Sequence, residues 1–531
     1  MASQEKPSRR EFKLPVKSAH VERFYPLLEA LAGRDELNEI LKHRVAKACQ
    51  LLDENIPLYP NDFVKTDDLG RVVADHAAMD ADTLAAREGT ISLAGRIVAL
   101  RSFGKVAFFH LQDATGKIQC YAAREDMGEA NYAAFKKFDI GDIVGVTGRL
   151  FRTKTDELTL GLSEARLLAK SMRPLPEKYH GLKDVEIRYR QRYVDLIVTS
   201  RTAEIFKTRT RILSGLRRFF DERGFVEVET PMMQAIPGGA TAKPFLTHHN
   251  ALDLQLYMRI APELYLKRLL VGGFEKVYEI GRNFRNEGIS TQHNPEFTMC
   301  EFYWAYARFD DLMDLTEELF SRLAGEVCGS AVITYQGQEI NLTAGTWRRV
   351  AFHESLESIG GISPDIYGDY EACKAYVLKS GEKVVKEEKL GKLQAKLFDL
   401  FVEPKLVQPT FIHSYPTDIS PLSRRNEQNP DLTDRFELFI AGREMANAFS
   451  ELNDPVDQRL RFEAQAAEKA AGDDEAHFMD EDYVRALEYA MPPAAGQGIG
   501  VDRLVMLLTD SASIREVILF PLLKPEDEAA Q

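Results

Sequence analysis

The chain has 531 residues, and a prior of about 150 residues per domain predicts roughly three or four domains. Its hydrophobic content of 44%, charged content of 28% and formal net charge of −14 are typical of a soluble globular protein. This composition excludes wholesale disorder and a collagen-like fibre. No apolar run approaches the ~18 residues of a membrane span, so we expect no membrane partner.

The cysteines and the first residues indicate a compartment. Five cysteines lie far apart and no two have CxxC spacing, which is typical of free thiols in a reducing cytoplasm. Residues 1–17 are polar and basic without an apolar core, so we expect no secretory signal and a cytoplasmic protein. The acidic balance argues against coating nucleic acid by bulk charge but permits a local basic groove.

Residues 1–88 are predicted to be a helical extension followed by a connector. Apolar residues recur at helical spacing from Phe24 to Asn61, where prolines break the pattern. An Ala- and Asp-rich connector, residues 67–87, follows.

Residues 89–170 change to a period of two, which predicts strands. Five short strands favour a small β-barrel, of which the oligonucleotide-binding (OB) fold is one type. The predicted strands are Ile91–Leu100, Lys105–Leu111, Ile118–Ala122, Asp142–Leu150 and Leu158–Leu168.

Two outward positions of this barrel suit RNA. Alternation buries Ala107 and Phe109 but leaves Phe108 exposed beside His110, and it turns Gln119 outward. An exposed aromatic next to a polar side chain suits the stacking and reading of unpaired bases. The alternative is an ordinary surface aromatic.

Residues 171–192 form a basic linker, interpreted as solvated, with a strip that faces phosphates as the alternative. Residues 193–531 mix helices with strands but lack regular βαβ alternation, which predicts an α+β domain with an antiparallel sheet. A helical insertion is expected at about residues 350–430. No phosphate-loop, dinucleotide, HExxH or GxSxG motif is present, so a nucleotide would be bound by another architecture.

Four segments of this domain carry candidate chemistry. On an extended chain Asn283, Arg285 and Glu287 share a face, where the arginine suits a phosphate or carboxylate; a structural Arg–Glu pair is the alternative. A polar loop with His293 and Asn294 follows. In the next segment Phe297, Met299, Glu301 and Tyr303 share one face, which favours a pocket wall over a half-exposed strand.

The third segment places Asn447, Phe449 and Glu451 on one face, after Glu437 and Glu444. Carboxylates beside a phosphate site are natural Mg²⁺ ligands, although a spacing of seven alone does not define a metal site. The fourth, Gly498–Arg503, allows close backbone approach and puts Arg503 in a first helical turn, pointing towards the sheet; a helix-surface arginine is the alternative.

Two of these segments, together with a third that lies earlier in the chain, resemble the class II aminoacyl-tRNA synthetases. Phe284–Glu287 resembles motif 2, Gly498–Arg503 motif 3, and Gly224–Pro231 motif 1, whose proline lies at the family's dimer interface. The strongest likeness, from about Asn61 to Pro521, is to the bacterial-type lysyl-tRNA synthetases. It rests on Tyr179–Leu182, Arg188–Arg192, Ile236–Gly239, Ala261–Arg268 and Phe449–Asn453.

The resemblance implies a lysine–tRNA ligase that forms lysyl-adenylate from ATP, releases AMP and diphosphate, and acts as a homodimer through residues 225–231. Arg285 would bridge the lysine carboxylate and the α-phosphate. Phe297 would stack on adenine, with Arg503 on the opposite ring face or near the γ-phosphate. Further ATP contacts would be Glu287, His293, Asn294 and Glu437. Several Mg²⁺ ions would accompany ATP, held by Glu437 and Glu444.

The same resemblance implies the contacts to lysine and to tRNA(Lys). Gly239 and Glu301 would meet the α-amino end of lysine. The side-chain ammonium would lie among Glu263, Tyr303, Asn447, Phe449 and Glu451. The anticodon contacts would be Arg101, Phe108, Gln119 and Glu157.

The charge of the pocket distinguishes the possible amino acid substrates. A desolvated lysine ammonium needs carboxylates around it. Glu263 and Glu451 would instead repel aspartate, so an aspartate or asparagine enzyme is disfavoured. A protein-lysylating paralogue would lack the barrel, and an inactive RNA-binding relative would not need the Arg and Glu set. Where the family usually has glycines, this chain has Ala441, Ala446 and Ala448, whose methyls are expected to narrow the site.

Overall fold

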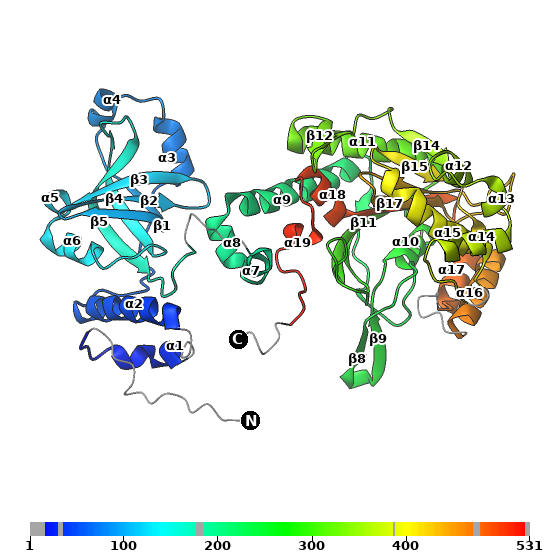
Figure 1. The fold of residues 1–531 in the computed structure, drawn as a ribbon, viewed down its shortest axis with the longest axis horizontal. Helices are drawn as coiled ribbons and strands as arrows, with labels where there is room; N and C mark the ends of the chain where they lie inside the picture. Colours follow the sequence, from blue (N-terminus) through cyan, green and yellow to red (C-terminus); the bar gives the residue numbers. More distant parts are fainter. Residues whose placement is uncertain (1–15, 30–34, 177–183, 386–387, 471–477, 526–531) are drawn as a thin grey trace. The chain divides into compact units, whose positions relative to one another are not determined.

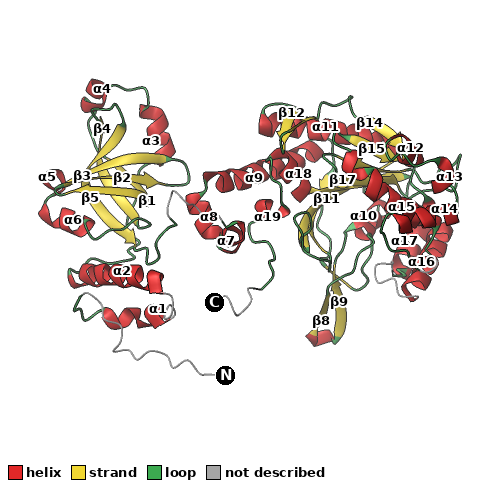
Figure 2. Cartoon of the chain, viewed as in Figure 1, coloured by secondary structure: helices red, strands yellow, loops and turns green. Residues whose placement is uncertain are grey.

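The computed structural model describes residues 16–29, 35–176, 184–385, 388–470 and 478–525. The chain divides into two compact units, Met1–Gly181 and Leu182–Gln531. Figure 1 shows the helices and strands of each unit, and Figure 2 separates them from the loops. No helix in these described ranges is long and apolar enough to cross a membrane.

The first unit contains the barrel that the sequence predicted. Five strands close in the order β1-β2-β3-β5-β4, and Ala107, Phe109 and Leu111 point into the core as expected. The strands are β1 (Ile91–Phe103), β2 (Val106–Gln112), β3 (Lys117–Ala123), β4 (Ile143–Arg152) and β5 (Leu158–Ala169), with α5 (Arg124–Met127) and α6 (Glu129–Phe135) between β3 and β4.

The helical prediction for the N-terminal extension is wrong in its bounds. The described residues form α1 (Tyr25–Glu29) and α2 (Asp35–Asp53), and α2 ends before Asn55, whose φ of 59° is left-handed. The expected connector instead contains two short helices, α3 (Leu69–His76) and α4 (Ala81–Ala85).

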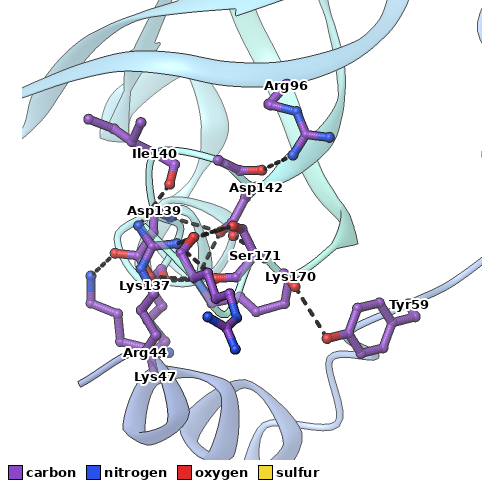
Figure 3. A network of polar contacts seen from close by, with 12 residues as sticks. Arg44, Lys47, Tyr59, Arg96, Lys137, Asp139, Ile140, Asp142, Lys170 and Ser171 are labelled. Carbon is purple, nitrogen blue, oxygen red and sulfur yellow. Dashed lines mark hydrogen bonds and ion pairs between the residues drawn. The ribbon is translucent and has the colours of Figure 1, made fainter. Parts of the chain in front are cut away.

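A buried polar network fixes α2 to the barrel (Figure 3). The Lys170 ammonium donates to Asp139 at 2.5 Å and to Asp142 at 2.9 Å. From α2, Arg44 donates to the backbone carbonyl of Ile140 and Lys47 pairs with Asp139 at 2.6 Å. Every carboxylate of the network therefore has a cationic or backbone partner.

The second unit is built on an eight-stranded sheet in the order β14-β15-β16-β17-β18-β11-β10-β6. Its pairs are antiparallel except for the parallel pairs at the two edges, β14 with β15 and β10 with β6. This confirms the α+β prediction. The strands are β6 (Val226–Glu227), β10 (Lys276–Phe284), β11 (Glu296–Ala305), β14 (Arg348–Ala351), β15 (Thr410–His413), β16 (Arg435–Phe439), β17 (Glu444–Ser450) and β18 (Ala494–Gly500).

Helices cover one face of this sheet and leave a site on the other. Cys300 and Phe302 of β11 pack in a core with α9 (Ser200–Asp221), α11 (Phe309–Cys328) and α18 (Val501–Leu508). Tyr303, on the alternate face, packs with α10 (Glu263–Val271) and α17 (Glu481–Glu488). The polar alternate residues of β11 therefore face away from α9, α11 and α18.

The remaining elements surround this sheet. A three-stranded sheet joins β7 (Met233–Gln234), β8 (Leu246–His249) and β9 (Leu254–Met258), and β12 (Val332–Tyr335) pairs with β13 (Gln338–Asn341). Between β14 and β15 lie α12 (Phe352–Ser358), α13 (Pro364–Tyr367), α14 (Tyr370–Lys379) and α15 (Leu390–Phe401). The other helices are α7 (Val185–Arg190), α8 (Arg192–Val198), α16 (Pro455–Ala470) and α19 (Ile514–Val517).

The expectation of a solvated basic linker is wrong for its described C-terminal part. Arg192 is 1% exposed, pairs with Asp195 at 2.7 Å and donates to backbone carbonyls of the same unit. Arg188 pairs with Asp195 as well. The segment Tyr179–Leu182, on which part of the resemblance rests, lies outside the described residues.

Candidate active site

A cavity of about 350 Å³ opens on the sheet face that carries the polar residues of β11. Its walls come from α10, β11, β16, β17, β18 and the loop between β10 and β11. The residues predicted from the sequence that line it are Gly239, Glu263, Arg285, Glu287, His293, Asn294, Phe297, Glu301, Tyr303, Glu437, Glu444, Asn447, Phe449 and Arg503. The structure thus brings the predicted ATP, magnesium and lysine residues to one place, with the exception of Glu451.

The cavity floor depends on glycines in β18. A Cβ on Gly496 would come within 2.3 Å of both the Glu451 carboxylate and the Tyr303 ring, and a Cβ on Gly498 within 2.8 Å of Met299. Side chains at these positions would fill the space that the neighbouring strands leave. β18 therefore supplies a bare backbone against the acidic end of the cavity.

That acidic end consists of two buried carboxylates of the wall, Glu263 and Glu301, and of the buried Glu451 behind it. Burial, with a further contribution from the Glu263 charge, raises the pKa of Glu301 to about 8. The Tyr303 hydroxyl donates to Glu301 at 3.3 Å. Burial also raises the pKa of Glu263 and of Glu451, more than nearby cations lower it. This end of the cavity would be stabilised by added positive charge.

Glu451 lies behind the cavity wall, and its partner is a residue that the sequence analysis did not single out. The Lys267 ammonium, fully buried on α10, forms ion pairs with Glu451 and, at 2.5 Å, with Glu263. The signal that could have found it is the i,i+4 spacing of Glu263 and Lys267 on a helix.

The cavity wall also carries a guanidinium, that of Arg285. Arg285 follows β10 directly and lies over the Phe297 ring at 5.1 Å. Among the described residues it has no ion-pair partner, and its Nε has no hydrogen-bond partner. The interpretation of Arg285 as half of a structural Arg–Glu pair is therefore wrong.

Asn283, which was predicted to share a face with Arg285, is buried and is not part of the cavity wall. It lies opposite Phe297 in the register of β10 and β11.

Arg503 points back towards the sheet, as predicted. From the first turn of α18 it donates to the backbone carbonyl of Glu444 at 2.5 Å and to its carboxylate at 3.3 Å. Its other terminal nitrogen lies 3.4 Å from His293 Nε2. Burial, together with the Arg503 charge, lowers the pKa of His293, so the imidazole is held neutral. The helix-surface alternative is excluded.

The two carboxylates predicted for magnesium, Glu437 and Glu444, border the cavity and accept hydrogen bonds from other side chains. Glu437 accepts from Arg435 at 2.5 Å and from the Tyr415 hydroxyl at 2.8 Å. Burial raises the pKa of Glu437 despite Arg435. Within the described ranges, no group of three or more His, Cys, Asp or Glu side chains is placed to hold a metal ion. An ion here would need oxygen ligands from a bound phosphate as well.

The alanines that replace family glycines have different positions. Ala448 is fully buried in the core between the sheet and α9, α11 and α18, so the expectation that its methyl narrows the site is wrong. Ala446 borders both that core and the cavity. Ala441 has a φ of 55°, a left-handed conformation that strains a side chain with a Cβ.

The barrel residues predicted to contact an anticodon gather on its outer face. Arg101 lies opposite Phe108 in register, Gln119 lies opposite His110, and His110 is 3.7 Å from Glu157. Phe108 is half-buried rather than exposed, because Tyr121 packs against it with ring centroids 4.9 Å apart. Tyr121 follows Gln119 at strand spacing, and this period could have revealed it as a second stacking surface.

Comparisons with known proteins agree with this geometry. Residues 184–524 match the family model "tRNA synthetases class II (D, K and N)", and residues 91–175 match "OB-fold nucleic acid binding domain". A lysine–tRNA ligase of Carboxydothermus hydrogenoformans is 55% identical over 93% of this chain and 99% of its own length.

Two further relatives named lysine–tRNA ligase are similar. That of Pelotomaculum thermopropionicum is 54% identical over 94% of this chain and 98% of its own length. That of Salmonella typhi is 52% identical over 93% of this chain and 98% of its own length. The chain therefore belongs to the class II tRNA synthetases, in the D, K and N group, with an OB-fold nucleic-acid-binding domain ahead of the synthetase domain.

Proposed function

We infer that the chain is a lysine–tRNA ligase, which activates lysine with ATP and transfers the lysyl group to tRNA(Lys) with release of AMP and diphosphate. One observation carries this inference: the cavity wall holds two buried carboxylates, Glu263 and Glu301, with Glu451 behind it, and also Arg285, which has no ion-pair partner among the described residues. An amino acid with a cationic side chain and a carboxylate to be joined to phosphate complements both kinds of group.

The lysine-binding roles follow this polarity. Gly239 and Glu301 meet the α-ammonium, and Glu263, Tyr303 and Glu451 surround the ammonium of the side chain. Asn447 and Phe449 line the path between them. Gly239 has a φ of 89°, and a Cβ there would lie 2.8 Å from that of Glu263, so only glycine leaves room beside this carboxylate.

Activation is an in-line displacement that needs no protein nucleophile. A carboxylate oxygen of lysine attacks the α-phosphorus of ATP, and the bond to the bridging oxygen of the β-phosphate breaks to release pyrophosphate. Arg285 holds the carboxylate and the α-phosphate together, and the nearby Phe297 ring stacks on adenine. Arg503 binds ATP on the side opposite the Phe297 ring, and Glu287, His293 and Asn294 lie around the nucleotide.

Glu437 and Glu444 would hold Mg²⁺ together with oxygens of ATP, which fits two carboxylates that border a phosphate site without forming a complete cage. More than one ion is expected with ATP. When bound, Mg²⁺ offsets the negative charge of the phosphates. Mg²⁺ binding requires both carboxylates ionised, and the contacts of Arg435 to Glu437 and of Arg503 to Glu444 orient these side chains.

In the second step a hydroxyl of the terminal adenosine of tRNA attacks the activated carbonyl carbon, and AMP leaves. The barrel binds the anticodon through Arg101, Phe108, Gln119 and Glu157. A protein-lysylating relative would not need this barrel. Phe108→Ala is expected to weaken aminoacylation about tenfold but to spare tRNA-independent ATP–pyrophosphate exchange. Equal losses in both assays would contradict the anticodon role.

The active form is proposed to be a homodimer in the cytoplasm, where tRNA is charged. β6 is an edge strand within residues 225–231, and exposed apolar side chains lie near it in the chain: Val226, Met232 and Met233. Such side chains favour a protein interface. Light scattering of the purified chain would measure its mass.

The function is tested by ATP–pyrophosphate exchange with each of the twenty amino acids. Lysine alone is expected to give strong exchange. Exchange supported by aspartate or asparagine, but not by lysine, would overturn the inference.

A further inference from the structure

We propose that Lys267 is a positioning residue that sets the lysine specificity of the cavity: its ammonium orients Glu263 and Glu451 and neutralises one of the three carboxylates. This inference rests on the proposed binding of lysine in the cavity. Lys267 does not line the cavity itself, so it acts through the two glutamates rather than on the substrate.

The geometry makes Lys267 the centre of the acidic end. It is fully buried on α10 and donates to Glu263 Oε1 at 2.5 Å. It also forms an ion pair with Glu451, neither of whose oxygens has another hydrogen-bond partner within the described residues. The rings of Phe449 and Tyr483 lie 5.2 and 6.0 Å from the ammonium. The orientation of Glu451 therefore depends on Lys267.

Charge balance explains what this arrangement selects. The neighbouring arginines Arg259, Arg268 and Arg435 pair with other carboxylates, those of Glu279, Asp480 and Glu437. Among the described residues, Lys267 is thus the cation that pairs directly with Glu263 and Glu451, whereas the cations that act on Glu301 are Arg259 and Arg285.

A bound lysine brings an α-ammonium and a side-chain ammonium. Together with Lys267 these give three cations for three carboxylates, while the lysine carboxylate meets Arg285. An amino acid with a neutral side chain leaves one buried carboxylate uncompensated, which is strongly unfavourable. Lys267 thus compensates one of the two carboxylates with which it pairs and leaves the other for the ammonium of the ligand's side chain.

Lys267 also sets the protonation of its neighbours. Burial lowers the pKa of Lys267, but Glu263 and Glu451 outweigh this effect and the pKa lies above its ordinary value, so the ammonium stays charged. In turn, the Lys267 charge lowers the pKa of both glutamates, although the larger effect of burial keeps both pKa values above their ordinary range. The charged and titratable groups around this cluster are Glu263 and Arg268 of α10, Glu301 and Tyr303 of β11, Arg435 of β16, Glu451, Tyr483 of α17, and Arg259 and Arg285, which act on Glu301.

The test uses the full chain with Lys267→Met, assayed by ATP–pyrophosphate exchange over a range of lysine concentrations and pH. Without the ammonium, one glutamate takes up a proton and Glu451 loses its partner. We expect the KM for lysine to rise at least tenfold while the KM for ATP changes less than twofold. The acidic limb of kcat/KM for lysine is expected to move about one unit towards higher pH.

Two comparisons separate this role from a structural one. Lys267→Arg keeps the charge and should have a KM for lysine at least threefold below that of Lys267→Gln. Lys170→Met removes an equally buried lysine from the other unit and should leave the KM for lysine unchanged. These pairs also decide the question if Lys267→Met itself does not fold.

The outcomes are distinct. If the wild-type chain shows no lysine-dependent exchange, the proposed function fails. If it does, but Lys267→Met keeps its KM for lysine and its pH profile, the role of Lys267 is overturned and the function stands. A parallel loss in lysine and ATP parameters, or failure of every Lys267 variant to fold, would equally overturn it, because either result indicates a purely structural residue.

Discussion

Each unit of the molecule buries one lysine between two carboxylates, and the two clusters differ in what surrounds them. In the barrel, Lys170 lies between Asp139 and Asp142 (Figure 3). In the catalytic unit, Lys267 lies between Glu263 and Glu451. Both lysine side chains are fully buried.

The pKa directions reveal the difference. Burial raises the pKa of Asp139, but Lys170 and Lys47 outweigh it, and the pKa lies below its ordinary value. Glu263 and Glu451 instead have raised pKa values, because burial outweighs the single Lys267 ammonium that the two carboxylates share. The barrel cluster is complete without a ligand, whereas the cavity cluster lacks positive charge. A buried ion pair therefore indicates a ligand site only when the charges of the surrounding cluster do not balance.

The largest effect is expected from the cavity cation that has no carboxylate partner. Arg285→Ala should lower the rate of ATP–pyrophosphate exchange by roughly 10³-fold, because the developing charge at the α-phosphate loses its donor. Unfolding of the variant should match that of the wild type. Arg282→Ala is the control: Arg282 lies in β10, just before Arg285, but pairs with Glu296 at the surface, so this variant should retain exchange. Near-normal exchange in Arg285→Ala would refute the assigned role.

Removing the lysine of the complete cluster should cost stability but not activity. Lys170→Met leaves the buried Asp142 carboxylate without its ammonium, whereas Asp139 keeps Lys47, so we expect a loss of about 3–5 kcal/mol from the barrel. The sequence has two tryptophans, Trp304 and Trp347, and both belong to the catalytic unit. Circular dichroism should show an earlier transition, whereas tryptophan fluorescence should not move. A shifted fluorescence transition would mean that the two units unfold together.

The deficit of charge in the cavity should be visible as a pH dependence. Because the pKa of Glu301 is raised to about 8, this carboxyl is mostly protonated at pH 7, and an ammonium binds only its ionised form. The kcat/KM for lysine should therefore rise with pH and be about tenfold lower at pH 7 than on its plateau above pH 8. Glu301→Gln should bind lysine weakly and lose this dependence. A flat profile in the wild type would contradict the deficit.

The smallest expected effect comes from backbone strain at Ala441 rather than from charge. Ala441→Gly should stabilise the catalytic unit by roughly 0.5–1 kcal/mol, because glycine adopts the left-handed conformation at residue 441 without a Cβ clash. Ala448→Gly is the matched control. Its methyl is buried in the core, so it should be destabilised by about 1 kcal/mol. Denaturant unfolding followed by tryptophan fluorescence measures both.

Alternation along strands made much of the site predictable. Phe297, Met299, Glu301 and Tyr303 line one cavity because period two fixes their common face, whatever the rest of the fold. The same rule placed Phe108 and Gln119 on the outside of the barrel. The antiparallel sheet followed from the absence of βαβ order.

Features that depend on contacts distant in sequence were not predictable. Whether a helical lysine such as Lys267 faces solvent or two carboxylates depends on β17 and α10 meeting, which local spacing does not specify. Arg192 reads as part of a basic run, yet the carbonyls that bury it lie more than 300 residues away. The end of α2 was missed because Asn55 adopts a left-handed conformation that the apolar period does not signal.

The place of β18 in the sheet has a consequence for biosynthesis. This strand lies between β17 and β11, although both of these neighbours precede it in the chain. During translation the barrel strands, which end at Ala169, can pair while the ribosome is still elongating the chain. The catalytic sheet must wait, with its two halves unjoined, until β18 emerges from the ribosome. Newly made chains should thus hold a finished barrel before they acquire a catalytic cavity.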